Sequence, residues 1–147
     1  MHACKHIESV LHNEIPLTRA MEISVSHCDS NKIELTAPLS PNINHKSTAF
    51  GGSLYSIAVL CGWSFVFHQM QLNKLSGHIV IQHSEVNYNS PVDGEITAVC
   101  EFDDEIVLKR FMSTINRKGR GRIKLTVNII FEDKIAVQFF GHYVVHQ

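Results

Sequence analysis

The spacing of apolar residues predicts a short helix followed by two strands in the first part of the chain. Apolar positions recur at helical intervals over Cys4–Glu14, and Pro16 ends this segment. Apolar and polar residues then alternate over Met21–Val25 and again over Ile33–Ala37, as they do in half-buried strands. Asp29–Asn31, between the two alternating segments, is typical of a turn. We therefore expect a helix followed by two strands that a turn connects.

The second half of the chain has the pattern of four strands and one further helix. Apolar residues change to helical spacing over Asp104–Asn116, with acidic residues in the first turn and Gly119 at the end. The predicted strands are His78–Asn89, Ile96–Phe102, Arg122–Phe131 and Ile135–Val145. The expected fold class is α+β, with a mostly antiparallel sheet of about six strands around one apolar helix, in a single domain spanning residues 1–147.

The junction between a polar segment and an apolar segment is the most informative feature of the sequence. Pro38–Gly52 is mostly polar, and a structureless segment of that length inside a small domain is usually functional. Ser53–Leu72 is apolar on every side of a helical wheel, which predicts a buried helix that Ser53 caps. The first N–H groups of a helix have no partner within it, and the glycine pair Gly51 and Gly52 lets a ligand approach them. Such a site favours a carbonyl oxygen that becomes negative during a reaction.

Composition and charge narrow the partners that we expect. The 147 residues fit one domain of the commonest size, and 18% of them are charged. A net charge of −1 gives no electrostatic basis for non-specific binding to nucleic acid or to an acidic membrane. The longest apolar stretch, Leu54–Phe67, is too short to span a bilayer. The low charge together with 44% hydrophobic residues suggests that part of the surface is buried against another subunit.

The cysteines indicate a reducing compartment. Cys4, Cys28, Cys61 and Cys100 are far apart in the sequence, and no Cys-x-x-Cys motif is present. The first six residues lack the apolar core of a signal peptide. We therefore expect a cytoplasmic protein whose thiols are reduced and unpaired.

Two segments of the sequence resemble motifs of a known superfamily. Asn44-His45-Lys46-Ser47-Thr48-Ala49-Phe50-Gly51-Gly52 is similar to the Asn-x-x-Gly-x-x-His-Gly-Gly signature of acyl-CoA thioesterases with the hot-dog fold, with Phe50 where many members carry His. Val86–Val92 resembles the Tyr-x-x-Pro-Val strand end of the same proteins. The helix at Asp104–Asn116 and the ending Phe140–Val145 are similar to a bacterial family of thioesterases that occur alone or behind an N-acetyltransferase domain.

The resemblance implies a hot-dog fold and the hydrolysis of acyl-CoA or acyl-carrier-protein thioesters. It also implies a homodimer, or a dimer of dimers, in which two sheets join edge to edge and an acyl tunnel lies at the interface. The N–H group of Gly52 would form the oxyanion hole. No cofactor is needed beyond the coenzyme A of the substrate.

The sequence departs from these relatives at one position that matters for catalysis. Many relatives carry Asp or Glu on the buried helix two turns after the glycine pair, which falls near Val59, and Ser53–Leu72 contains no acid. The alternative function is therefore a non-catalytic module that binds acyl ligands. A dehydratase or hydratase of the same fold is a weaker alternative.

Candidate site residues follow from the loop and from one strand. By analogy, Asn44 orients a water or the carbonyl group, although asparagine also stabilises turns on its own account. His45, Phe50, Gly51 and Ser53 would contact the substrate. His83 and Glu85 alternate on one strand and could form a base and its orienting group, or a solvated polar edge or a dimer contact. Ile79 and Ile81 are expected on the same face of that strand.

A basic segment and the histidines complete the candidates. Arg117, Lys118 and Arg120 lie within a run of cations and glycines that could bind the phosphates of coenzyme A or of a carrier protein, or could be a solvated loop. His142 and His146 would lie about 13 Å apart along a strand, which is too far to share a metal ion. We expect no metal site.

Overall fold

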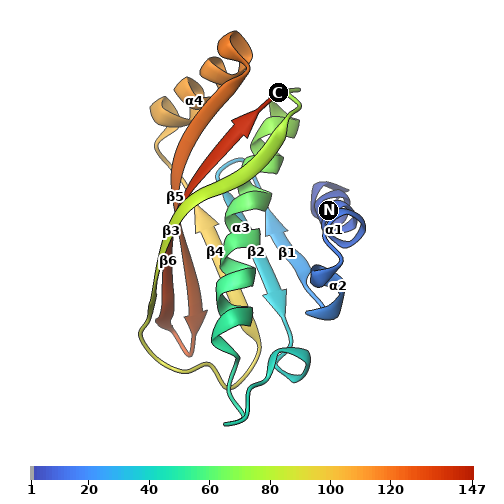
Figure 1. The fold of residues 1–147 in the computed structure, drawn as a ribbon, viewed down its shortest axis with the longest axis vertical. Coiled ribbons are helices and arrows are strands. Elements are labelled where there is room, and N and C mark those ends of the chain that lie inside the picture. The colour runs from blue at the N-terminus through green and yellow to red at the C-terminus, as the bar shows by residue number, and fades with distance from the viewer. Residues whose placement is uncertain (1) are drawn as a thin grey trace.

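A strongly curved antiparallel sheet encloses one face of a long helix, α3 (Figure 1). The computed structural model describes residues 2–147, in which six strands pair in the order β1-β2-β4-β5-β6-β3. All of these strand pairs are antiparallel. The expected α+β class and six-stranded sheet are confirmed. The strands are β1 (Ser24–Cys28), β2 (Lys32–Ala37), β3 (His78–Tyr88), β4 (Ile96–Glu101), β5 (Arg120–Phe131) and β6 (Lys134–His146).

Two N-terminal helices, α1 (His2–Glu14) and α2 (Leu17–Ala20), lie beside β1 (Figure 1). The Glu8 carboxylate of α1 accepts a hydrogen bond from the N–H of Val25 at 2.9 Å, so α1 covers part of the otherwise open edge of the sheet. The sequence did not indicate α2 because a helix of one turn has no periodicity to detect. The first strand starts at Ser24, three residues later than expected.

The buried helix α3 (Gly51–Leu72) starts two residues earlier than predicted. Phe50 occupies the N-cap position with an extended backbone, at φ −62° and ψ 133°, and no side chain caps the helix. The capping role expected for Ser53 is therefore wrong, because this residue lies inside the first turn. Ile57, Ala58 and Phe65 are among the helix residues that pack into the core.

The segment before α3 is folded rather than structureless. It contains a short 3₁₀ helix, η1 (Ser40–Asn42), and an isolated bridge between Ile43 and Ala49. The Ala49 N–H donates to the carbonyl of Val92 at 2.7 Å, and this bond ties the loop to the β3–β4 connection. The chain therefore enters α3 along a defined path.

The basic run forms a helix end and a strand start instead of a loop. The helix α4 (Glu105–Lys118) is capped at its N-terminus by Asp104, which accepts from the N–H of Val107 at 3.1 Å. It ends at Gly119, whose φ of 74° is the left-handed conformation that glycine adopts at low cost. Across residues 2–147, no helix has the combination of length and apolar character that a membrane span requires.

Candidate functional site

The start of α3 presents backbone donors to the surface. The N–H groups of Ser53 and Leu54 both donate to the Phe50 carbonyl, at 2.9 and 3.0 Å. Within residues 2–147, no acceptor is found for the N–H groups of Gly51 and Gly52. Gly52 is exposed, so a ligand can reach this end of the helix. Two free donors and the positive end of the helix dipole therefore point in the same direction.

Two aromatic side chains flank the glycine pair. The Phe50 ring, which is 56% exposed, lies against Gly52 so closely that an added Cβ atom would overlap it. The Tyr88 hydroxyl donates to the Gly51 carbonyl at 3.1 Å, and its ring lies beside Gly51. Burial raises the pKa of Tyr88, so at neutral pH its hydroxyl keeps the proton that it donates to Gly51.

Asn44 holds the loop that leads to the site. Its side-chain oxygen accepts from the N–H groups of Lys46 and Thr48, at 2.8 and 3.1 Å. Its amide nitrogen donates to the Thr48 hydroxyl at 2.8 Å and to the Ala49 carbonyl at 3.4 Å. Both amide protons are thus used within the loop. This geometry supports the turn-stabilising alternative for Asn44 and not the orientation of a water. His45 lies exposed in the same loop.

Asn42 anchors the start of the loop, and no sequence pattern distinguishes this residue. The residue is 2% exposed, and its amide donates to the carbonyls of Met21 and Pro38 at 3.0 and 2.9 Å. The backbone carbonyl of Asn42 accepts from the N–H of Phe50 at 2.8 Å. Asn42 therefore fixes where α3 begins.

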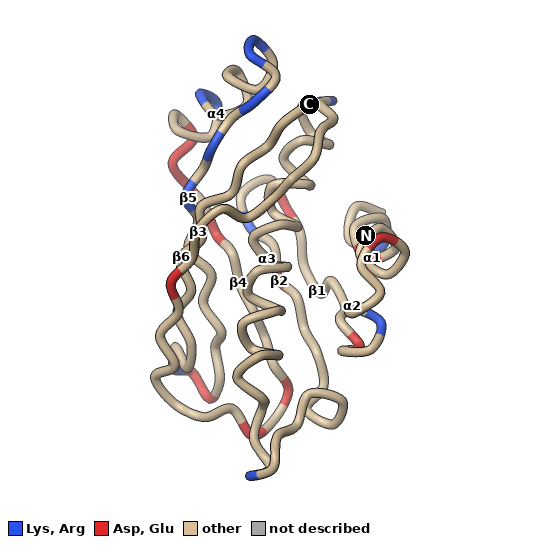
Figure 2. Tube along the Cα trace, viewed as in Figure 1, with Lys and Arg blue, Asp and Glu red and all other residues tan. Residues whose placement is uncertain are grey.

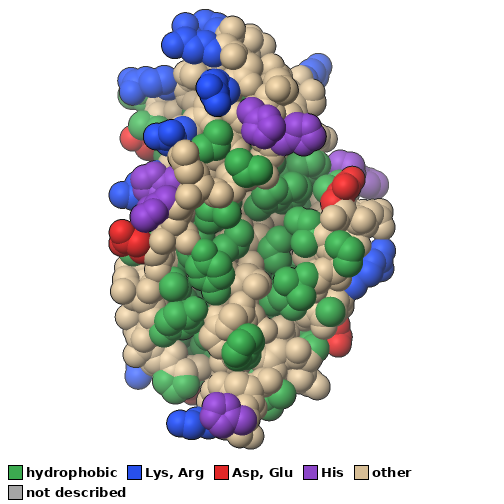
Figure 3. Space-filling model, in the orientation of Figure 1, with side chains coloured by type: hydrophobic (Ala, Val, Ile, Leu, Met, Phe, Trp, Pro, Cys, Tyr) green, Lys and Arg blue, Asp and Glu red, His purple; other side chains and the backbone are tan. Residues whose placement is uncertain are grey.

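The outer side of α3 carries a stripe of half-buried apolar residues, Val59, Trp63 and Phe67, here called the α3 stripe. These residues are four apart and so share one face of the helix. The rings of Trp63 and Phe67 stack with centroids 5.3 Å apart. Figure 3 shows apolar side chains gathered along the middle of this face of the molecule, over α3. The position at which many relatives are expected to carry an acid falls near Val59.

Tyr55 and Ser84 are further polar residues near the helix start that sequence analysis missed. The Tyr55 hydroxyl lies 2.5 Å from the Ser84 hydroxyl, which links α3 to the inner face of β3. Tyr88 lies on the same strand, within the strand-end motif that was recognised. That motif was the available signal for Tyr88, whereas nothing in the sequence pairs Tyr55 with Ser84.

The structure contradicts the expected placement of His83 and Glu85. A bulge between Ile81 and His83 inserts one extra residue, so the side chains after it change faces. Ile79 and Ile81 pack against the core, whereas the side chains of His83 and Glu85 are 61% and 74% exposed on the opposite face. His83 Nε2 lies 3.8 Å from Glu85 Oε1. Within one chain the sheet separates this pair from Gly52.

The outer-face pair belongs to a polar cluster of its own. A hollow of about 210 Å³ is lined by His83, Glu85, Lys124, Phe140 and His142. The rings of His83 and His142 meet edge to face with centroids 5.4 Å apart. This arrangement matches a solvated polar edge, which was one of the alternatives stated for His83 and Glu85.

Lysine and arginine residues concentrate around α4 and the start of β5 (Figure 2). Lys118, Arg120 and Arg122 line a groove of about 430 Å³, here called the basic groove. Arg117 is exposed in the last turn of α4 but is not part of the groove lining. Since α3 is about 33 Å long and α4 lies near its C-terminal end (Figure 1), the groove and Gly52 are at opposite ends of one chain.

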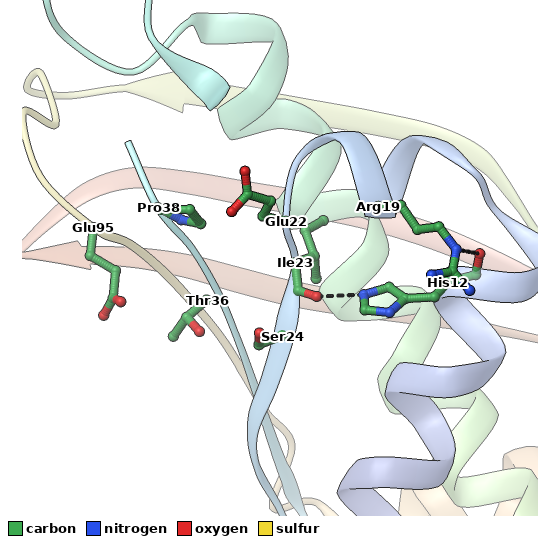
Figure 4. A pocket seen from close by; sticks show the side chains of 8 residues that line it. All are labelled: His12, Arg19, Glu22, Ile23, Ser24, Thr36, Pro38 and Glu95. Atoms are coloured by element: carbon green, nitrogen blue, oxygen red, sulfur yellow. Dashed lines mark hydrogen bonds between the residues drawn. The ribbon is translucent and has the colours of Figure 1, made fainter. Parts of the chain in front are cut away.

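A wider groove of about 500 Å³ lies between α1, α2 and the first two strands (Figure 4). His12 and Arg19 face it, but His12 Nε2 is 2.7 Å from the Ile23 carbonyl and Arg19 Nε donates to the His12 carbonyl. Arg19 thus ties α2 to α1, and His12 ties α1 to the segment that precedes β1. Glu22, Ser24 and Glu95 also line the groove, but among the described residues the His12 ring is hydrogen-bonded to none of them.

Metal and thiol chemistry find little support in the described part of the chain. Among residues 2–147, no group of three or more His, Cys, Asp and Glu side chains is placed to hold a metal ion. Cys61 and Cys100 are fully buried, and burial raises the pKa of both thiols well above its usual value. Neither is suited to act as a nucleophile.

A long helix enclosed by an antiparallel sheet, with free N–H groups where the helix begins, defines a hot-dog domain of the thioesterase type. Over residues 4–147 the chain matches the model of the family described as "Putative thioesterase (yiiD_Cterm)", and it belongs to that family. Both the recognised family and the hot-dog fold are thereby confirmed. Membership supports hydrolysis of thioesters in general.

Solved structures agree with this assignment. A protein of unknown function from Chlorobaculum tepidum TLS is similar with a TM-score of 0.93 and 34% identity, over 98% of this chain and 94% of that chain. A protein described as the "putative thioesterase from Shewanella oneidensis" has a TM-score of 0.87 and 28% identity, over 99% and 98% of the two chains. The E. coli PaaI protein, at 14% identity and a TM-score of 0.68 over 99% and 94%, shows the fold alone.

Proposed function

We propose that this protein hydrolyses acyl-CoA thioesters, with the N–H of Gly52 donating to the thioester carbonyl oxygen. The observation that carries the proposal is the pair of backbone donors without acceptors at the start of the buried helix. When water attacks the carbonyl carbon, the oxygen becomes an anion, which these donors and the helix dipole stabilise. The carbon–sulfur bond then breaks and leaves a carboxylic acid and free coenzyme A. No cofactor is required for this reaction.

The acyl chain would lie along the α3 stripe. Val59 is about two turns beyond Gly52 on the same helix, and Trp63 and Phe67 continue the apolar surface in the same direction. Phe50 and Tyr88 would contact the groups on either side of the thioester. Apolar residues that are half-buried in one chain become a tunnel wall when a second surface covers them.

A homodimer joined through β3 would supply that second surface. β3 is one of the two edge strands of the sheet and has eleven residues, whereas α1 covers part of the other edge at β1. An exposed edge strand of this length pairs readily with a second copy of itself. In an antiparallel pair the end of β3 near Tyr88 lies beside the second copy's end near His78.

The same dimer would bring the basic groove of one copy close to the glycine pair of the other. His78 is in register with His146, and His146 is in register with Arg120, so the groove lies at the His78 end of the sheet. Lys118, Arg120 and Arg122 would then bind the phosphates of coenzyme A while the thioester reaches Gly52 of the second copy.

A second candidate function is a binding module for acyl thioesters without catalysis. α3 carries no acid, and His83 and Glu85 face away from Gly52. Neither α3 nor the inward face of β3 therefore supplies a carboxylate base for water attack at the glycine pair. This observation favours binding without turnover.

A panel of acyl-CoA substrates from acetyl to palmitoyl, with an enoyl-CoA and an acyl-carrier protein added, separates these functions. Loss of the thioester should be followed by chromatography, because a thiol reagent would also react with exposed cysteines. Turnover of any acyl-CoA supports hydrolysis, and hydration of the enoyl-CoA would indicate the hydratase instead. Calorimetric binding without turnover would establish the binding module. An absence of both turnover and binding would reject both candidates.

A further inference from the structure

Two cysteines that are far apart in the sequence meet at the edge of the sheet. Cys4 lies in the first turn of α1, and Cys28 is the last residue of β1. Their Sγ atoms are 2.9 Å apart. Since the sulfur atoms of a disulfide are about 2 Å apart, closing the bond requires a movement of only about 1 Å. Both residues are partly exposed, so a small oxidant can reach them.

We propose that Cys4 and Cys28 form a reversible disulfide that ties α1 to the edge strand β1. The oxidant is a peroxide. The Cys4 thiolate attacks one peroxide oxygen and the O–O bond breaks, which gives a sulfenic acid and a hydroxide; this hydroxide takes up the proton that Cys4 released and becomes water. The Cys28 sulfur then attacks the Cys4 sulfur, and the hydroxide that leaves takes the Cys28 proton and departs as a second water. Two electrons pass from the thiols to the peroxide, and a dithiol reductant reverses the change.

The surroundings of the two thiols assign their roles. Burial, together with the contact to Cys4, raises the pKa of Cys28 to about 12. Cys28 is therefore protonated at neutral pH, which leaves the first attack to Cys4. Once Cys4 is a neutral sulfenic acid, the negative charge that opposed ionisation of Cys28 is gone, and Cys28 can carry out the second step. Cys61 and Cys100 are fully buried, so a peroxide in solution does not reach them. The reaction is thus selective for one pair.

The disulfide would fix the first turn of α1. Ile7 and Leu11 bury one side of the helix, Glu8 binds β1, and His12 contacts the Ile23 carbonyl, but all four lie beyond the first turn. The disulfide would add a covalent tie at the opposite end. The ring of His6, two residues after Cys4, lies 6.0 Å from that of Phe67. Oxidation would therefore hold α1 beside the α3 stripe.

The test compares the reduced full-length protein before and after mild hydrogen peroxide. After oxidation, the native protein should have lost both thiols that react with Ellman's reagent, those of Cys4 and Cys28. Unfolding the oxidised protein should then reveal two reactive thiols, those of Cys61 and Cys100. The intact mass should fall by about 2 Da, and peptide mapping should recover a cross-linked pair that contains Cys4 and Cys28. The melting temperature should rise by roughly 5–10 °C, and dithiothreitol should reverse every change.

Cys4→Ser and Cys28→Ser are the matched controls, and neither should show the thermal shift on oxidation. Slower amide exchange in α1 of the oxidised wild type would support the predicted tie to β1. Native thiols that survive peroxide, oxygen addition without a cross-link, or a disulfide between two chains would each overturn the proposal. Because mass mapping uses wild-type protein, the result stands even if a serine variant fails to fold.

Discussion

The hydroxyl of Tyr143 on β6 donates a hydrogen bond to the carbonyl of Val59 on α3, at 2.7 Å. This contact joins the sheet to the middle of the helix that carries the candidate site. Tyr143 is fully buried, and Gly62 leaves the space that its ring occupies against the helix. Glycine within a helix is unfavourable, so packing against Tyr143 is its structural reason here.

Gly62→Ala should therefore destabilise the fold even though alanine favours helices. The new Cβ atom would overlap the hydroxyl of Tyr143 and lie 2.7 Å from its Cε2, and this side chain is fully buried. We expect a loss of about 1–3 kcal/mol in the free energy of unfolding, measured with urea. Tyr143→Phe should cost about 1 kcal/mol, and the double variant should lose less than the sum of the two. A Gly62→Ala variant as stable as wild type would show that the ring can move.

Gly52→Ala should reduce turnover while Gly51→Ala does not. A Cβ atom at Gly52 forces the exposed Phe50 ring to swing, and the ring then changes access to the free N–H. At Gly51 the nearest atom to a Cβ is 3.7 Å away, on Tyr88, which is an ordinary contact. We expect kcat/KM to fall by about tenfold to a hundredfold for Gly52→Ala. Equal rates in the two variants, with both folded by circular dichroism, would remove Gly52 from the proposed site.

Asn44→Ala should loosen the loop before α3. The N–H groups of Lys46 and Thr48 would lose the side-chain oxygen that accepts them, and their amide hydrogens should exchange about tenfold faster. Asn44→Asp keeps an oxygen at the same place and should preserve this protection. If Asn44 acts only on a bound water, amide exchange in the loop should be the same in all three proteins.

The buried helix and its enclosure by the sheet could be predicted because both follow from local patterns. A wheel that is apolar on every side, after a glycine pair, identifies α3 without any knowledge of its partners. The faces of His83 and Glu85 could not be predicted, because Ile79, Ile81, His83 and Glu85 fit a period of two without interruption. One extra residue at the bulge reverses the outcome, and only the pairing with β6 reveals it.

Contacts between distant segments were the other part that the sequence did not supply. The spacing of Cys4 and Cys28 carries no signal, since packing of α1 against β1 brings them together. Tyr55 and Ser84 are likewise joined only by the fold. The backbone donors of the site could be predicted, whereas the side chains around them depend on tertiary structure.

His68 should make the protein less stable below neutral pH. Burial lowers the pKa of this histidine from its usual value of 6.5, and the residue is 6% exposed. On acidification the unfolded chain binds the proton first, so the stabilisation is complete above about pH 6.5 and is lost as the pH falls to the lowered pKa. His68→Gln should flatten the decrease in melting temperature between pH 7.5 and about 5.5, whereas His78→Gln, at an exposed position, should not. Identical slopes for all three proteins would contradict this prediction.

Charge reversal in the basic groove should weaken the binding of coenzyme A without affecting the chemical step. Arg120 and Arg122 line the groove and are exposed, so Arg120→Glu with Arg122→Glu should leave the fold intact. We expect KM for an acyl-CoA to rise about tenfold at low salt, with kcat nearly unchanged, because two charge-assisted contacts to phosphate are lost.

A thioester of N-acetylcysteamine is the discriminating substrate, because it has the same reacting group but no phosphate. Its kinetic constants should be equal in wild type and in the double variant. Lys5→Glu, in an exposed position on α1 beside the other edge of the sheet, reverses a charge away from the groove and should leave both substrates unaffected. The groove would have no role in recognition if KM for both thioesters rose together, or if the effect on acyl-CoA persisted at high salt. A rise confined to acyl-CoA would show that the phosphates bind in the basic groove. Because this groove and Gly52 lie at opposite ends of one chain, the thioester would then have to reach Gly52 of the second copy.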